Sequence, residues 1–127
     1  KLAGKHSMKI TRIFTDATGE THFETAEEPG VEFRDNAAYT RVIDAYGVAF
    51  RETKAMGDEP ALGRWHTAPQ RQFVMILIGE TEIEVSDGEK RVFKSGDVMM
   101  VEDTKGKGHR NRRLSKEPEL WAYARSH

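Results

Sequence analysis

The sequence contains no cysteine among its 127 residues. Disulfides and thiolate chemistry are therefore excluded, and any metal site must use nitrogen and oxygen ligands. No apolar run approaches the roughly 20 residues that a membrane-spanning helix needs, so we expect no membrane segment. Charge of one sign is not in excess either: 20 Lys and Arg face 21 Asp and Glu, for a net charge of -1. This balance gives no long-range attraction to nucleic acid, which we do not expect as a partner.

Several catalytic signatures are also missing. The sequence has no G-x-S-x-G, P-loop, dinucleotide-binding fingerprint or H-E-x-x-H. These patterns position a serine nucleophile, nucleotide phosphates or a catalytic zinc, so their absence leaves no organic cofactor indicated. Catalytic residues therefore cannot be named from a standard motif.

The length suits one domain, which we expect to span residues 8–127. We interpret residues 1–7 as the remnant of an expression tag, with Met8 as the native start. No hydrophobic segment of a signal peptide is visible near the start, and the lack of cysteine fits the cytoplasm. We therefore expect a cytoplasmic protein.

Short strands separated by turn signals dominate the chain, which is typical of a closed barrel or sandwich. We expect a break at Glu27–Gly30 and, from Asp35 to about Ala45, one short helix near the middle. The path of residues 31–64 otherwise stays open. Strands are predicted at residues 8–14, 21–25, 47–53, 72–78, 81–85, 90–94, 98–101 and 119–124.

The predicted strand at residues 72–78 is apolar on both faces. Gln72 shares one parity with Val74 and Ile76, whereas Phe73, Met75 and Leu77 share the other. Such a strand needs cover on both sides, and a barrel interior supplies only one. Arg71 has the parity opposite to Gln72 and should point away from the interior. We expect the second face to be covered by other parts of the chain or by a second copy, and we favour a homodimer.

Two segments contain most of the residues that could bind a metal or take part in catalysis. The first reads W-H-T-A-P-Q-R-Q-F-V-M-I-L-I-G from Trp65 to Gly79, and the second reads S-G-D-V-M-M-V-E-D-T-K-G-K-G-H from Ser95 to His109. They resemble the two motifs of the cupin superfamily, G-x5-H-x-H-x(3,4)-E-x6-G and G-x5-P-x-G-x2-H-x3-N. They are also similar to a group of small bacterial cupins.

The resemblance aligns particular residues with the cupin metal ligands. His66 matches the first histidine, Gln72 stands at the glutamate position, and His109 matches the histidine of the second motif. The chain departs from the pattern at Ala68, where the second histidine is expected, and at Arg113, where an asparagine is expected. The second motif is also two residues longer than the pattern and lacks its proline.

The cupin resemblance implies an all-β fold, a double-stranded β-helix or jelly-roll barrel. It also implies a divalent transition metal in the barrel mouth, held by His66, Gln72 and His109. Zinc, iron, nickel and manganese all suit two imidazoles and an oxygen donor. Either Glu102 or Asp103 could replace the lost carboxylate. The alternative is that these side chains are structural and hydrogen-bond to the backbone, to each other or to water.

Three functions remain open at this point. The chain could be a metal-dependent enzyme acting on a small molecule, such as an oxygenase, isomerase or lyase. It could instead be a metal-free module that binds a small ligand in the same barrel mouth, or a structural cupin whose role is association. Fold alone does not decide among them.

Overall fold

The computed structural model describes residues 7–127, and within that range every regular element is a strand. Residues 1–6 of the segment that we interpret as a tag lie outside the described residues, whereas Ser7 belongs to them. The ten strands are β1 (Ser7–Thr15), β2 (Thr21–Arg34), β3 (Ala37–Thr40), β4 (Tyr46–Thr53), β5 (Gln72–Ile78), β6 (Glu80–Val85), β7 (Lys90–Lys94), β8 (Val98–Val101), β9 (His109–Arg113) and β10 (Glu119–Arg125).

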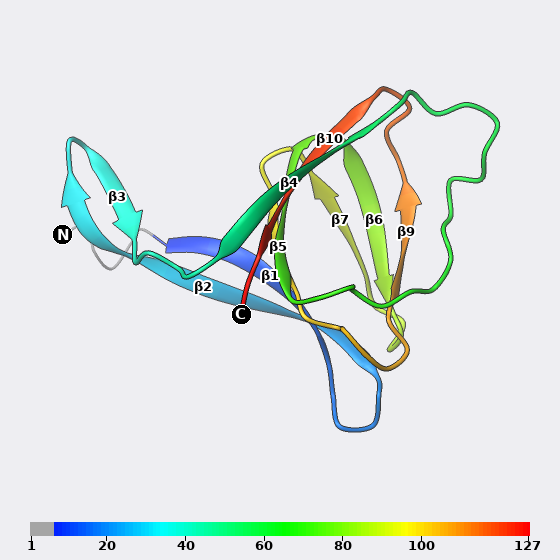
Figure 1. Ribbon diagram of the computed structural model, residues 1–127, viewed down its shortest axis with the longest axis horizontal. Coiled ribbons are helices and arrows are strands. Elements are labelled where there is room, and N and C mark those ends of the chain that lie inside the picture. Colours follow the sequence, from blue (N-terminus) through cyan, green and yellow to red (C-terminus); the bar gives the residue numbers. More distant parts are fainter. Residues whose placement is uncertain (1–6) are drawn as a thin grey trace.

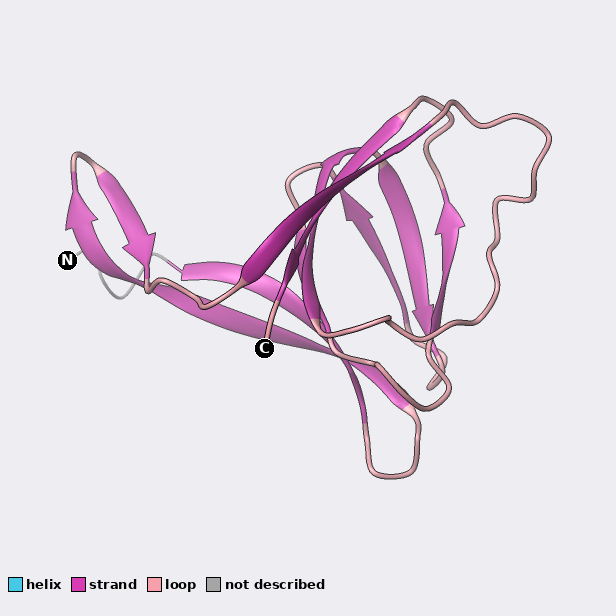
Figure 2. Ribbon diagram, in the orientation of Figure 1, coloured by secondary structure: helices cyan, strands magenta, loops and turns pink. Residues whose placement is uncertain are grey.

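The strands form two sheets that face each other across one core (Figures 1 and 2). The large sheet has the order β3-β2-β1-β8-β5-β10-β4, and the small sheet has the order β7-β6-β9. Only the β1–β8 pair is parallel among the printed strand pairs of residues 7–127. The prediction of an all-β jelly-roll barrel is confirmed.

The core lies between the two sheets and is built from the inward parity of each strand. Val74 and Ile76 face inward from β5 as predicted, while Glu82 and Glu84 of β6 face outward and pair with arginines of β9. The main core cluster comprises Ile13, Phe23, Ala68, Val74, Ile76, Ile83, Val85, Phe93, Met99, Val101 and Trp121.

Two predictions for the first half of the chain are wrong. The break expected at Glu27–Gly30 lies inside β2, where Pro29 pairs with Ser7 of β1. The helix expected from Asp35 does not form: β2 and β3 make a hairpin whose turn is Asp35–Asn36, with φ of 55° and 61°. This hairpin projects away from the barrel in Figure 1.

The segment that connects β4 to β5, residues 54–71, is irregular but follows β9. Leu62 pairs with Arg112 and His66 pairs with His109 as isolated bridges. Backbone N–H groups of Met56, Gly63 and Ala68 also donate to carbonyl groups of the 103–116 region. The connection therefore acts as a partial fourth strand of the small sheet and forms one wall of the barrel mouth.

Candidate functional site in the barrel mouth

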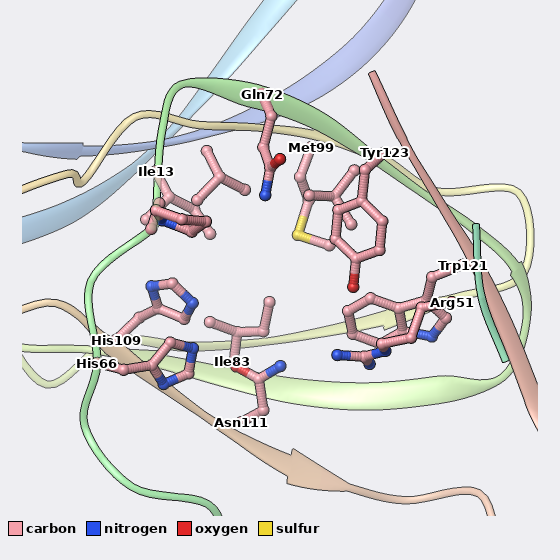
Figure 3. Close-up of a pocket in the computed structure, with 14 residues that line it drawn as sticks. Ile13, Arg51, His66, Gln72, Ile83, Met99, His109, Asn111, Trp121 and Tyr123 are labelled. Atoms are coloured by element: carbon pink, nitrogen blue, oxygen red, sulfur yellow. The ribbon is translucent and has the colours of Figure 1, made fainter. Parts of the chain in front are cut away.

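A cavity of about 310 Å³ opens between the two sheets. Fourteen residues line it and supply a mixture of apolar surface and a few polar groups, as is usual for small-molecule sites. They are Ile13, Arg51, His66, Ala68, Pro69, Gln72, Val74, Ile83, Met99, Val101, His109, Asn111, Trp121 and Tyr123 (Figure 3).

The backbone brings His66 and His109 together. The N–H of each histidine donates to the carbonyl of the other at 2.9 Å, and the ring centroids lie 4.4 Å apart. Gly108 makes this approach possible, because a Cβ at that position would lie 2.2 Å from the His66 carbonyl oxygen. Its φ of +75° also lies in the left-handed region that favours glycine.

Each imidazole uses Nδ1 for a hydrogen bond that leaves Nε2 available. His109 Nδ1 lies 2.6 Å from Asp103 Oδ2, and His66 Nδ1 lies 2.9 Å from the carbonyl oxygen of Arg64. Because a carboxylate and a carbonyl accept, Nδ1 is the donor in both rings and Nε2 keeps its lone pair when the ring is neutral. Both Nε2 atoms can therefore accept a proton or bind a metal.

The His109–Asp103 pair is buried: the side chains are 8% and 0% exposed. Asp103 Oδ2 holds the ring, while Asp103 Oδ1 is buried without a partner among the described residues. A carboxylate behind a histidine fixes its tautomer and orientation, an arrangement that often accompanies metal-ligating histidines. His66, in contrast, is exposed.

The structure places all three predicted site residues on the wall of this one cavity. His66 and His109 lie on one side, and the side chain of Gln72 points into the cavity from β5 (Figure 3). Among residues 7–127, however, no cluster of three or more His, Cys, Asp or Glu side chains has the spacing of a metal site. The metal role of His66, Gln72 and His109 therefore stays a prediction.

Neither suggested substitute carboxylate faces the cavity. Asp103 lies behind His109, on the Nδ1 side of the ring. Glu102 lies on the outer face, where it accepts hydrogen bonds from Arg12 and Arg71. Burial alone would raise the pKa of Glu102, but these two guanidinium groups outweigh it and lower that pKa. Arg71 points away from the interior, as predicted.

Beyond apolar residues, sequence reasoning missed four polar or aromatic lining residues: Arg51, Asn111, Trp121 and Tyr123. Trp121 and Tyr123 share a parity on the last strand, and this alternation was the available signal. Arg51 reaches the cavity because it pairs directly with Trp121 across β4 and β10. The Oδ1 of Asn111 and the Nε1 of Trp121 are buried without hydrogen-bond partners in the described part of the chain.

Comparisons with known proteins give no family for this chain. No family model matches it, and no curated protein matches it. Among solved structures, protein NMB1881 of Neisseria meningitidis is 24% identical over 66% of this chain and 79% of its own, with a TM-score of 0.43.

Two other solved structures are similar over most of the chain. A protein proposed to be ethanolamine utilization protein Q of Salmonella typhimurium LT2 is 14% identical over 95% of this chain and 97% of its own, with a TM-score of 0.44. A protein proposed to be a mannose-6-phosphate isomerase of Ralstonia eutropha JMP134 is 17% identical over 94% and 86%, with a TM-score of 0.39. These scores are too low to carry an argument, so the cupin resemblance depends on the motif residues and the barrel itself.

No helix in the described residues is long and apolar enough to cross a membrane.

Proposed function

We propose that the chain binds a divalent transition metal through His66 and His109, with Gln72 as a third ligand, and acts on a small molecule in the same cavity. The observation that supports this most is the paired imidazoles, whose Nδ1 atoms are held by Asp103 and by the Arg64 carbonyl. A metal bound there with open positions would polarise an oxygen of the substrate or activate water. The cavity wall would orient the substrate beside it.

The donor set fits zinc, iron, nickel or manganese but predicts weaker binding than a site with a carboxylate. Gln72 offers a neutral amide oxygen in place of a charged one, and the position of Ala68 offers no ligand at all. The metal would therefore keep its full positive charge. We also propose, as parts of the same function, a cytoplasmic location and a homodimer.

Metal uptake tests the proposal directly. Protein purified without a chelator should contain about one equivalent of metal, or take it up from zinc, iron, nickel or manganese solutions. The metal affinity of the His66→Ala variant should fall by more than the roughly 10–100-fold that is typical when only a group hydrogen-bonded to a metal ligand is removed. His66 is exposed, so its removal should leave the fold intact. His127→Ala is the matched control, since that histidine lies at the C-terminus and does not line the cavity.

A metal-free binding module is the second candidate. It is favoured by the unpartnered buried atoms of Asn111 and Trp121, which a polar ligand would satisfy, and by the lack of a charged third metal ligand among residues 7–127. Protein that takes up none of the four metals, while its cavity residues respond to small ligands in NMR titrations, would replace the first proposal with this one.

A further inference from the structure

Arg51 is the cationic residue on the cavity wall away from the histidines. Its guanidinium carbon lies 4.5 Å from the Trp121 ring centroid and 5.9 Å from that of Tyr123. In Figure 3 this group of three residues occupies one side of the cavity, and His66 and His109 occupy the other. Stacking on the two rings fixes the guanidinium by its face and leaves its N–H groups at the edge free to donate.

No carboxylate neutralises Arg51 within residues 7–127: its guanidinium has neither an ion pair nor a hydrogen bond there, and its contacts are with the Trp121 and Tyr123 rings. The two buried acids nearby each face another cationic or titratable group. Asp103 holds His109, and Glu119, which lines the adjoining cavity together with Arg51, forms an ion pair with Arg113 at 3.7 Å, although its Oε2 has no hydrogen bond within residues 7–127. A charged arginine in a cavity wall without an acid is suited to bind an anion from outside the chain.

Two more donors lie beside Arg51 without acceptors. The Tyr123 hydroxyl has no hydrogen bond to any described residue, and in Figure 3 it points into the cavity above the guanidinium. Burial and the nearby charge of Glu119 raise the pKa of Tyr123, against the opposing effect of Arg51, so the phenol stays protonated and able to donate at neutral pH. Trp121 Nε1 is the third donor, buried without an acceptor.

The remaining wall is mainly apolar. In Figure 3 Ile13, Ile83 and Met99 lie between the arginine side and the histidine side, and Val74 also lines the cavity. Such a surface favours a ligand whose middle is hydrocarbon or an aromatic ring, because its burial removes apolar area from water. The cavity thus has a cation and hydrogen-bond donors at one side, mainly apolar residues in the middle and two imidazoles at the other side.

We infer that the cavity binds a small organic carboxylate, with its carboxylate at Arg51 and Tyr123 and its opposite end directed toward His66 and His109. The planar guanidinium matches the two oxygens of a carboxylate, which can accept two parallel hydrogen bonds. This inference rests on the proposed function, because it names the ligand class of the same cavity. It also makes Arg51, an exposed residue at the cavity wall, a specificity-determining residue.

Benzoate and benzamide are a suitable probe pair, because they share the ring and differ in the charge of one group. We expect the full chain to bind benzoate about tenfold or more tightly than benzamide, as one charge-assisted hydrogen-bond pair would give. Arg51→Met should weaken benzoate binding by a similar factor and leave benzamide binding unchanged. Dissociation constants from calorimetry or NMR titration measure both effects.

Arg125→Met is the matched control, since it removes an exposed arginine of β10 that lines neither cavity. Equal affinity for benzoate and benzamide, an unchanged preference in Arg51→Met, or no binding of either probe would each overturn the inference. Failure of the proposed metal function would be distinguishable, because the protein would then take up no metal and still prefer benzoate to benzamide. If benzamide binds as tightly as benzoate, the cavity is a binding site but does not select a carboxylate.

Discussion

The carboxylate of Asp103 controls what His109 can do. It is completely buried, and its hydrogen bond to Nδ1 directs Nε2 of His109 into the cavity. We expect Asp103→Asn to keep the shape and an acceptor oxygen but to lose the negative charge. Metal affinity should then fall by about 10–100-fold, which is the usual effect of changing a partner behind a metal-ligating histidine. Metal titration of the two proteins measures this.

The control for this change is Asp97→Asn, which alters a carboxylate whose bond to the Lys94 backbone N–H lies in a turn away from the cavity. If Asp103→Asn binds metal as tightly as the native protein does, the carboxylate only supports the fold. In that case the free energy of unfolding alone should change.

Gly108 is the position where the site has least room. Replacement by alanine would place Cβ 2.2 Å from the His66 carbonyl oxygen, at a φ of +75°. We expect a cost of about 1–2 kcal/mol for the left-handed backbone and about 1–3 kcal/mol more for the displaced His66 segment. Urea unfolding of Gly108→Ala measures the sum. Gly88→Ala is the control, with φ of +99° and open space around its Cβ, so it should show only the first cost.

The candidate site residues differ in how far the sequence alone could identify them. His66, Gln72 and His109 were found because their spacing resembles a motif, and the structure places them on one cavity wall. Arg51 could not be found in that way. Its position depends on the pairing of β4 with β10, two strands far apart in the chain, and no local pattern determines that pairing.

At the scale of the elements, strands were predicted where alternation was strong, and the errors fall where one local signal has two meanings. Asp35–Asn36 is typical of a helix start, yet the same residues also tolerate positive φ and form hairpin turns. Pro29 usually interrupts a strand, but at the end of the β1–β2 pairing it is accommodated. Tertiary pairing, which local sequence does not encode, decided both cases.

A histidine clamp joins two turns that belong to different sheets. His22 of β2 lies 2.6 Å from Asp16 in the β1–β2 turn and 2.7 Å from Asp87 in the β6–β7 turn. Hydrogen bonds to Asp16 and then Asp87 raise the pKa of His22, and bonds from Thr18 and His22 lower the pKa of Asp16. The clamp is therefore strongest when the histidine is charged and both carboxylates are ionised.

The pH dependence of this clamp follows from the directions in which the pKa values of His22 and Asp16 are shifted. Because the pKa of His22 is raised in the folded protein, its stabilisation is complete below the ordinary value of 6.5 and is lost as pH rises through the folded value. The Asp16 contribution is present above its ordinary value of 3.8 and is lost as pH falls. We expect the stability difference between the native protein and His22→Gln to be largest between these values.

Urea unfolding across the pH range measures that difference. His127→Gln is the control, because its partner Asp44 is 3.6 Å away and both side chains are largely exposed. A difference that stays constant from acid to alkaline pH would mean that His22 stabilises the protein only by packing, for example against Phe14.

At the scale of the whole molecule, the outer face of the large sheet carries more apolar surface than residues 7–127 cover. The strand register places Phe50, Ala122, Met75 and Val98 in one row across four strands. Met75 was expected to need cover, and it is only half-buried. Farther toward the β4 edge the described residues leave the face open: Phe50 is 69% exposed and Val48 is 65% exposed. An apolar face on an edge strand is typical of a protein–protein contact.

We therefore expect a homodimer in which this face is shared, and Phe50→Glu should dissociate it. A charge buried in the contact without a partner would be strongly unfavourable, whereas in the monomer it would lie in water. Sedimentation or light scattering over a range of concentrations measures the change. The control is Val92→Glu on β7, where an exposed valine lies in the other sheet and should leave the dimer intact. A native protein that stays monomeric at every concentration would exclude the homodimer. A dimer that Val92→Glu dissociates and Phe50→Glu does not would place the contact elsewhere.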